Sequence, residues 1–163
     1  MREEAFSPES KRKRNSCKAV VFDGDTVLLT RNGDRMGDFY LLPGGGQHMG
    51  ETLHEAVRRE TMEETGWLVE PGRLLLVRDY IGAHHEFAGE NGDVHQVELM
   101  FAAELLERVE GWEPVRDAWQ TGVEWLSLAR LDDVRIYPSV LAELLPGMAT
   151  GTYSGPVYLG DVN

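Results

Sequence analysis

Residues 41–67 read LLPGGGQHMGETLHEAVRRETMEETGW and contain the signals for a strand, a glycine loop and a helix. The apolar residues before Pro43 suit a short strand, and the three glycines after it stop that strand. Thr52 followed by Glu55 matches the capping box that begins many helices, and Gly66 is a typical helix end. We therefore predict a strand–loop–helix unit whose helix begins at Thr52 and ends before Gly66.

Three glutamates, Glu60, Glu63 and Glu64, lie in the last turns of this helix, where the helix dipole disfavours negative charge. At about 100° of rotation per residue, they continue the apolar side that starts at Leu53 and do not join the solvent side. Inward-facing carboxylates need a compensating cation. Oxygen ligands at this spacing suit Mg²⁺ or Mn²⁺. The alternative, a charged helix with salt bridges, explains neither the inward direction nor the glycine loop. The apolar side comprises Leu53, Ala56, Val57 and Thr61.

Two further features support a ligand site at this helix. Gly44 and Gly45 allow the backbone to approach a ligand closely, with amides available to phosphate oxygens and carbonyls available to a metal. Arg59 lies one helical turn from both Glu55 and Glu63, so it is expected to orient the acidic cluster from its flank.

The run from Gly45 to Trp67 resembles the Nudix box, which reads Gly, five residues, Glu, seven residues, Arg-Glu-apolar-any-Glu-Glu-any-Gly-apolar. Both spacers have the right length, and Trp67 fills the last apolar position. Thr61 stands where an aliphatic residue is usual, and its methyl group can pack. The resemblance implies an α/β fold, a sandwich of helices around a mixed β-sheet. The seven matching positions are Gly45, Glu51, Arg59, Glu60, Glu63, Glu64 and Gly66.

The resemblance also implies an activity, the hydrolysis of a nucleoside diphosphate linked to another group X. Carried over by position, Glu60, Glu63 and Glu64 would bind Mg²⁺ or Mn²⁺ with the carbonyl of Gly45. Arg59 would orient the glutamates, and Glu51 would support the site from the start of the helix. Nucleoside triphosphates, nucleotide sugars such as ADP-ribose, and dinucleoside polyphosphates all stay open as substrates.

The motif leaves the general base and the substrate contacts undecided. Glu98 lies on a strand whose other side is apolar. Glu98 is a catalytic candidate if its own side of the strand faces a cleft, and an exposed edge position is the alternative. Arg31 ends a strand and is a phosphate-binding candidate, with a surface salt bridge as its alternative. Aromatic residues can stack on a base or sugar, although packing is the commoner role for each. These are Tyr80, Trp112, Trp119 and Trp125.

The rest of the chain predicts one domain. We expect a loosely ordered N-terminal arm over 1–16, a Nudix hydrolase domain over 17–148 and an irregular C-terminal tail over 149–163. Within the domain, the pattern predicts a hairpin around Asp23-Gly24-Asp25 and a helix over 137–147 that begins near Pro138 and ends at Gly147. Further strands are expected in the ranges 73–83, 95–105 and 123–131.

The composition narrows the partners. A net charge of −12 disfavours nucleic acid, with KRKR at 11–14 as the counterweight. No apolar run approaches the roughly 20 residues of a membrane-spanning helix, and the first residues lack a signal-peptide core. The single cysteine, Cys17, is expected to be a packed hydrophobe in a reducing cytoplasm. A homodimer is compatible with a domain of this size.

Two other functions compete with small-molecule nucleotide hydrolysis. The same fold can serve as a non-catalytic nucleotide sensor, although a sensor has less need of a complete set of motif acids. Removal of diphosphate from RNA 5′ ends is the other alternative, which the negative charge disfavours.

Overall fold

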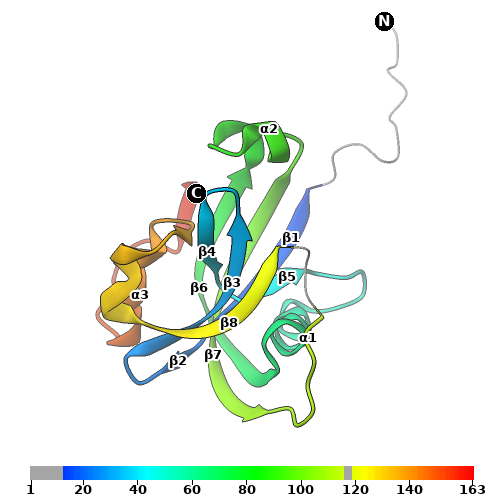
Figure 1. The fold of residues 1–163 in the computed structure, drawn as a ribbon, viewed down its shortest axis with the longest axis vertical. Helices are drawn as coiled ribbons and strands as arrows, with labels where there is room; N and C mark the ends of the chain where they lie inside the picture. The colour runs from blue at the N-terminus through cyan, green and yellow to red at the C-terminus, as the bar shows by residue number, and fades with distance from the viewer. Residues whose placement is uncertain (1–12, 116–118) are drawn as a thin grey trace, which may run out of the picture.

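The computed structural model describes residues 13–115 and 119–163, which form two mixed β-sheets with helices beside them (Figure 1). The strands are β1 (Arg14–Val20), β2 (Phe22–Asp23), β3 (Thr26–Asp34), β4 (Gly37–Leu41), β5 (Gly44–Gly46), β6 (Trp67–Ile81), β7 (His95–Arg108), β8 (Gln120–Ser127), β9 (Ile136–Tyr137) and β10 (Tyr158–Asp161). The α-helices are α1 (Leu53–Thr65), α2 (Ala88–Asn91) and α3 (Leu141–Ala149), and 3₁₀ turns cover η1 (Gly82–His84) and η2 (Leu128–Asp133).

The strand order places the glycine loop beside the first strand. One sheet runs β10-β6-β7-β1-β5, with β1 parallel to β7 and antiparallel to β5. The second runs β2-β3-β4-β9, with β8 paired to β3. Each sheet contains both parallel and antiparallel pairs, so the predicted α/β fold with mixed β-structure is confirmed.

The two longer helices lie on opposite sides of the strands (Figure 1). Helix α1 buries Ala56 and Val57 in a core cluster with Cys17 of β1. Helix α3 buries Leu141 and Leu145 in a second core cluster, which also contains residues from strands of both sheets and Leu131 of η2. None of the helices in the described ranges has the length and apolar character needed to cross a bilayer.

Helix α1 begins and ends as its sequence predicts. The hydroxyl of Thr52 accepts a hydrogen bond from the Glu55 amide at 3.2 Å, and the Glu55 carboxylate accepts one from the Thr52 amide at 2.7 Å. Gly66 ends the helix with φ of 74° and donates its amide to Met62. The buried side consists of Ala56, Val57, Thr61 and Thr65.

Replacing Thr52 with alanine is expected to lower the free energy of unfolding by about 1 kcal/mol, because the Glu55 amide loses its acceptor. Urea unfolding of the purified domain measures this change. Thr52→Ser keeps the acceptor and should stay within a few tenths of a kcal/mol of the wild type. Equal losses in the two variants would contradict a role for the hydroxyl.

Three expectations outside the motif are wrong. Helix α3 begins at Leu141 rather than near Pro138, because the preceding residues pair with β4 as β9, and it continues past Gly147 to Ala149. The C-terminal segment is not irregular, since β10 pairs with the edge of β6. The first strand starts at Arg14, before the expected position 17, because the β7 pairing extends that far.

Some predictions fall partly outside the described residues. Residues 11 and 12 of the basic run KRKR are among them, whereas Lys13 is exposed and Arg14 opens β1. The division of the chain at 1–16, 17–148 and 149–163 stays a prediction. Cys17 is fully buried, and burial raises the pKa of its thiol to about 11, as expected for a packed hydrophobe.

Candidate active site

The glycine loop and the acidic helix meet because β5 lies between β1 and α1. The Gly44 amide donates a hydrogen bond to Oε2 of Glu64 at 2.9 Å. At Gly45, a Cβ atom would lie 2.7 Å from Cδ of Glu60. Both glutamates therefore reach the loop backbone itself, and a larger residue at Gly45 would push the Glu60 carboxylate away.

Arg59 holds the acidic cluster together. Its guanidinium donates to both carboxylate oxygens of Glu51, at 2.7 and 3.0 Å, and to Oε1 of Glu60 at 2.8 Å. It also donates to Oε2 of Glu63 at 3.4 Å and to the carbonyl of Gly46 at 2.9 Å. The expected contact with Glu55 is not made, because the Glu55 carboxylate caps the helix.

The charges of this cluster depend on one another. The bidentate hydrogen bond from Arg59 lowers the pKa of Glu51 to about 2, against the opposing effect of burial, and the His48 amide adds to the lowering. Glu51 in turn raises the pKa of Arg59 above its ordinary value. At neutral pH, Glu51 is therefore an anion that holds the Arg59 cation next to Glu60.

The Glu51–Arg59 pair makes a testable contribution to stability. Because the folded-state pKa of Glu51 is about 2, below the ordinary value of 4.5, its contribution is complete above pH 4.5 and disappears as pH falls toward 2. We expect Glu51→Gln to lose about 1–2 kcal/mol of unfolding free energy at pH 7 and almost nothing at pH 2. Urea unfolding of the wild type and of Glu51→Gln between pH 7 and pH 2 measures the difference in unfolding free energy. A difference independent of pH would contradict the assignment.

The donor chemistry fits a hard divalent cation. Glu60 and Glu64 present carboxylate oxygens beside the glycine backbone, and Mg²⁺ and Mn²⁺ prefer oxygen ligands. With the side chains as they stand, no three acidic, histidine or cysteine side chains within 13–115 and 119–163 are arranged to hold a metal. Arg59 instead bonds Oε1 of Glu60 and Oε2 of Glu63, so each carboxylate would offer a metal its second oxygen.

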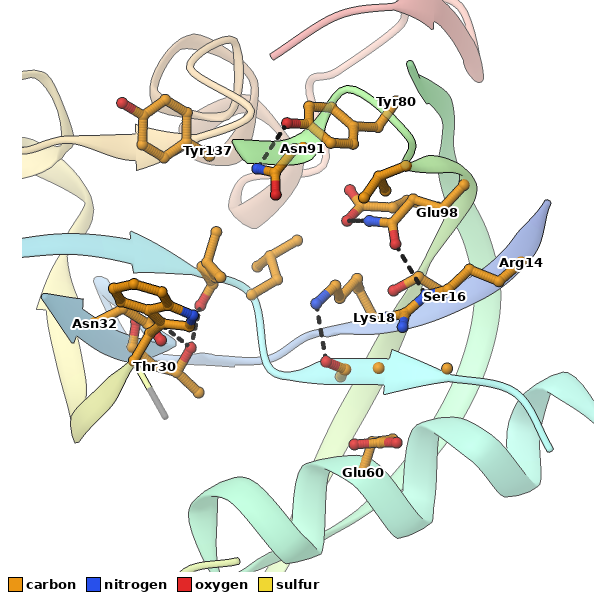
Figure 2. A pocket seen from close by; sticks show the side chains of 18 of the residues that line it. Arg14, Ser16, Lys18, Thr30, Asn32, Glu60, Tyr80, Asn91, Glu98 and Tyr137 are labelled. Carbon is orange, nitrogen blue, oxygen red and sulfur yellow. Dashed lines mark hydrogen bonds between the residues drawn. The ribbon is translucent and has the colours of Figure 1, made fainter. Parts of the chain in front are cut away.

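A cleft of about 1280 Å³ opens beside this cluster, and residues of both sheets line it (Figure 2). Of the predicted site residues, five line the cleft: Gly44, Gly45, Glu60, Glu64 and Glu98. Glu51, Arg59 and Glu63 do not line the cleft, but Arg59 pairs with Glu51, with Glu63 and with the cleft residue Glu60.

Glu98 faces the cleft from β7 but is closely bound. Its side chain is 6% exposed, its Oε2 accepts a hydrogen bond from Arg78 at 2.5 Å, and its Oε1 accepts one from Gln96 at 3.0 Å. Burial alone would raise the pKa of this carboxyl, but the positive charges of Arg78 and Lys18 lower it overall. Arg78 also donates to the carbonyl of Val162, which ties the C-terminal segment to this ion pair.

Arg31 lies apart from the cleft and pairs with Glu124 of β8 at 2.8 Å. Two of the aromatic candidates, Tyr80 and Trp119, line the cleft. The other two pack elsewhere: Trp125 makes an edge contact with Trp67, and the Trp112 ring covers the Cα of Gly66.

Sequence reasoning missed several cleft residues. Ser16 and Lys18 of β1, Asn32 of β3 and Tyr137 of β9 all line the cleft (Figure 2). The alternation of polar Ser16 and Lys18 with apolar Cys17 is a signal for the first two, since alternate residues of a strand share a face. The others come together only through sheet pairing.

These features define a class, an α/β domain in which a glycine loop and an acidic helix border a wide cleft. The chain belongs to the NUDIX domain family, whose profile matches residues 12–146. The family suggested by the Gly45–Trp67 motif is therefore confirmed, and members of this family generally use divalent metal ions.

Relatives and structures agree with the family. A diphosphoinositol polyphosphate phosphohydrolase 3-alpha of Mus musculus is 29% identical over 108 residues, 66% of this chain and 60% of that protein. The 8-oxo-dGDP phosphatase NUDT18 of Mus musculus is 41% identical over 73 residues, 41% of this chain and 22% of that protein. The chain thus spans about 60% of the length of the first of these relatives.

Among solved structures, a NUDIX hydrolase from Nitrosomonas europaea superposes with a TM-score of 0.70 at 18% identity, covering 86% of this chain and 91% of that one. This likeness confirms the fold. The names of the relatives are consistent with the expected enzyme class, a NUDIX pyrophosphohydrolase.

Proposed function

We propose that this domain hydrolyses the phosphoanhydride bond of a nucleoside diphosphate linked to another group, with Mg²⁺ or Mn²⁺ as cofactor. The observation that carries the proposal is the juxtaposition of Glu60 and Glu64 with the glycine loop at the edge of a cleft large enough for a nucleotide. Both named relatives act, by their names, on phosphorylated small molecules.

Glu60, Glu63 and Glu64 would hold the metal together with the carbonyl of Gly45, and the bound metal would neutralise phosphate charge and acidify water. The amides of the glycine loop would contact phosphate oxygens. In the reaction, the oxygen of water forms a bond to one phosphorus, the bridging P–O bond breaks, and a carboxylate takes the proton of water.

The general base is assigned to the motif rather than to Glu98. Arg78 and Gln96 occupy both oxygens of Glu98, and the lowered pKa makes this carboxylate a weaker base. Glu64 lies on the cleft and against the loop where phosphate would bind. We therefore propose that turnover depends most on the negative charge of Glu64. Glu98 is assigned to the wall of the cleft.

A phosphate-release screen tests the function. Nucleoside triphosphates, nucleotide sugars, dinucleoside polyphosphates and 5′-triphosphorylated RNA would be incubated with the protein and Mg²⁺, with EDTA as the metal-free control. We expect Mg²⁺-dependent turnover of at least one nucleotide. Binding without turnover on any compound would favour a nucleotide sensor, and turnover of RNA ends alone would favour the RNA function.

A reducing compartment such as the cytoplasm agrees with the single buried cysteine.

A further inference from the structure

Strand β1 presents a polar face to the cleft. Arg14, Ser16 and Lys18 occupy alternate positions, so their side chains share one face of the strand, and all three line the cleft (Figure 2). Cys17 and Ala19, on the opposite face, are fully buried in the core cluster that contains α1. We call the three cleft-facing residues the β1 wall.

Ser16 gives the wall an unused hydrogen-bonding group. The residue is 1% exposed and lines the cleft, yet its hydroxyl has no hydrogen-bond partner within the described part of the chain. A buried hydroxyl without a partner costs free energy, and native proteins rarely leave one unsatisfied. A group bound in the cleft would supply the missing partner.

The two cations of the wall make hydrogen bonds to neutral groups. Nε of Arg14 donates to the side-chain oxygen of Gln96 at 3.1 Å, and Nζ of Lys18 donates to the carbonyl of Gly44 at 2.8 Å. Four carboxylates that line the same cleft are instead matched by arginines. These pairs are Asp34–Arg135, Glu60–Arg59, Glu90–Arg35 and Glu98–Arg78. Glu64 and Asp93 also line the cleft, and the charges of Lys18 and Arg14 act on Glu98. The wall nevertheless places two cations at alternate positions of one strand in a chain with a net charge of −12.

The wall adjoins the proposed reaction site. In the β1–β5 pairing, Ser16 lies opposite Gly46 and Lys18 lies opposite Gly44. Figure 2 shows β5 between Glu60 on one side and Ser16 with Lys18 on the other. Because the residues of β5 are glycines, no β5 side chain would separate phosphates bound at the loop from the wall.

We propose that the β1 wall is a phosphate subsite for a phosphoryl group beyond the diphosphate held at the glycine loop. Arg14 and Lys18 supply positive charge, and Ser16 donates its hydroxyl to a phosphate oxygen. The inference rests on the proposed function and narrows its substrate. The domain should prefer chains of three or more phosphoryl groups, such as nucleoside triphosphates, over nucleotide sugars, whose group beyond the diphosphate is neutral.

Steady-state kinetics on matched substrates test the subsite. For one base, kcat/KM would be measured with the nucleoside triphosphate and with the nucleoside diphosphate sugar, in the wild type and in Lys18→Met, Ser16→Ala and Arg14→Gln. We expect Lys18→Met to lower kcat/KM for the triphosphate about 10- to 100-fold, and Ser16→Ala about 5- to 10-fold. The value for the nucleotide sugar should change less than about threefold.

Two controls separate binding from folding. Arg73 is exposed on β6 outside the cleft, so Arg73→Gln removes a charge without affecting the wall. This variant should leave kcat/KM unchanged for both substrates. Lys18→Arg keeps the charge and should restore most of the triphosphate activity lost in Lys18→Met. A general packing defect in Lys18→Met would lower kcat/KM for both substrates by the same factor and would reduce the melting temperature.

The outcomes distinguish the subsite from the proposed function. If the wild type turns over nucleotides but the wall variants lose kcat/KM equally for both substrates, or lose none for the triphosphate, the subsite is overturned and the proposed function stands. No turnover on any nucleotide overturns the function. In that case, calorimetry with inorganic tripolyphosphate decides the subsite: binding weakened about tenfold by Lys18→Met supports it, and unchanged binding overturns it.

Discussion

Replacing Glu64 with glutamine is expected to lower turnover at least about 100-fold while leaving the fold intact. Glutamine has nearly the same volume, and its side-chain oxygen can still accept the hydrogen bond from the Gly44 amide. It lacks the negative charge needed to bind a divalent cation or to take a proton from water. The geometry of the loop should therefore persist while the chemistry fails.

Two measurements check this result. The first is kcat/KM at saturating Mg²⁺ for the best substrate of the nucleotide panel, and the second is the melting temperature. Glu107→Gln is the matched control, since Glu107 is an exposed carboxylate at the end of β7, outside the cleft. A Glu64→Gln enzyme with a near-normal rate would remove Glu64 from the mechanism and return attention to Glu98.

Replacing Gly44 with alanine is expected to cost at least about 3 kcal/mol of unfolding free energy. Its φ of +140° is a conformation that residues with a side chain rarely adopt. An added Cβ would also lie 2.0 Å from the carbonyl oxygen of Cys17 and 2.8 Å from Cα of Lys18. Both obstacles are backbone atoms, so β1 and β5 would have to separate.

Gly50→Ala is the matched control for this substitution. Gly50 also has a positive φ, of +81°, but nothing lies within 4 Å of its Cβ position. It should therefore lose only about 1 kcal/mol through backbone strain. Urea unfolding of both variants measures the difference. Losses of equal size would show that the close approach of β5 to β1 carries no weight in stability.

Helix α1 shows how much local sequence predicts. The capping box at Thr52, the αL end at Gly66 and the buried side with Ala56 and Val57 agree with the structure, because each depends on residues within one or two helical turns. The bounds of α3 and the pairing of β10 were missed, since both are decided by contacts with distant strands.

The candidate site divides in the same way. The motif predicts which acids gather on α1, and five of the predicted residues do line one cleft. The motif does not predict that Arg59 bonds Glu51 rather than Glu55, because the choice depends on how the loop folds back over the helix. Nor does it predict that Arg31 pairs with Glu124 across a sheet, away from the cleft.

The sequence by itself determined the family, the glycine loop and the acidic side of α1, because these features are encoded within a continuous stretch of 27 residues, 41–67. Only the tertiary structure decided what faces them. The β1 wall reaches the glycine loop, and Arg78 reaches Glu98, through sheet pairings between segments far apart in the chain. Such pairings depend on the register of whole strands, which no short pattern specifies.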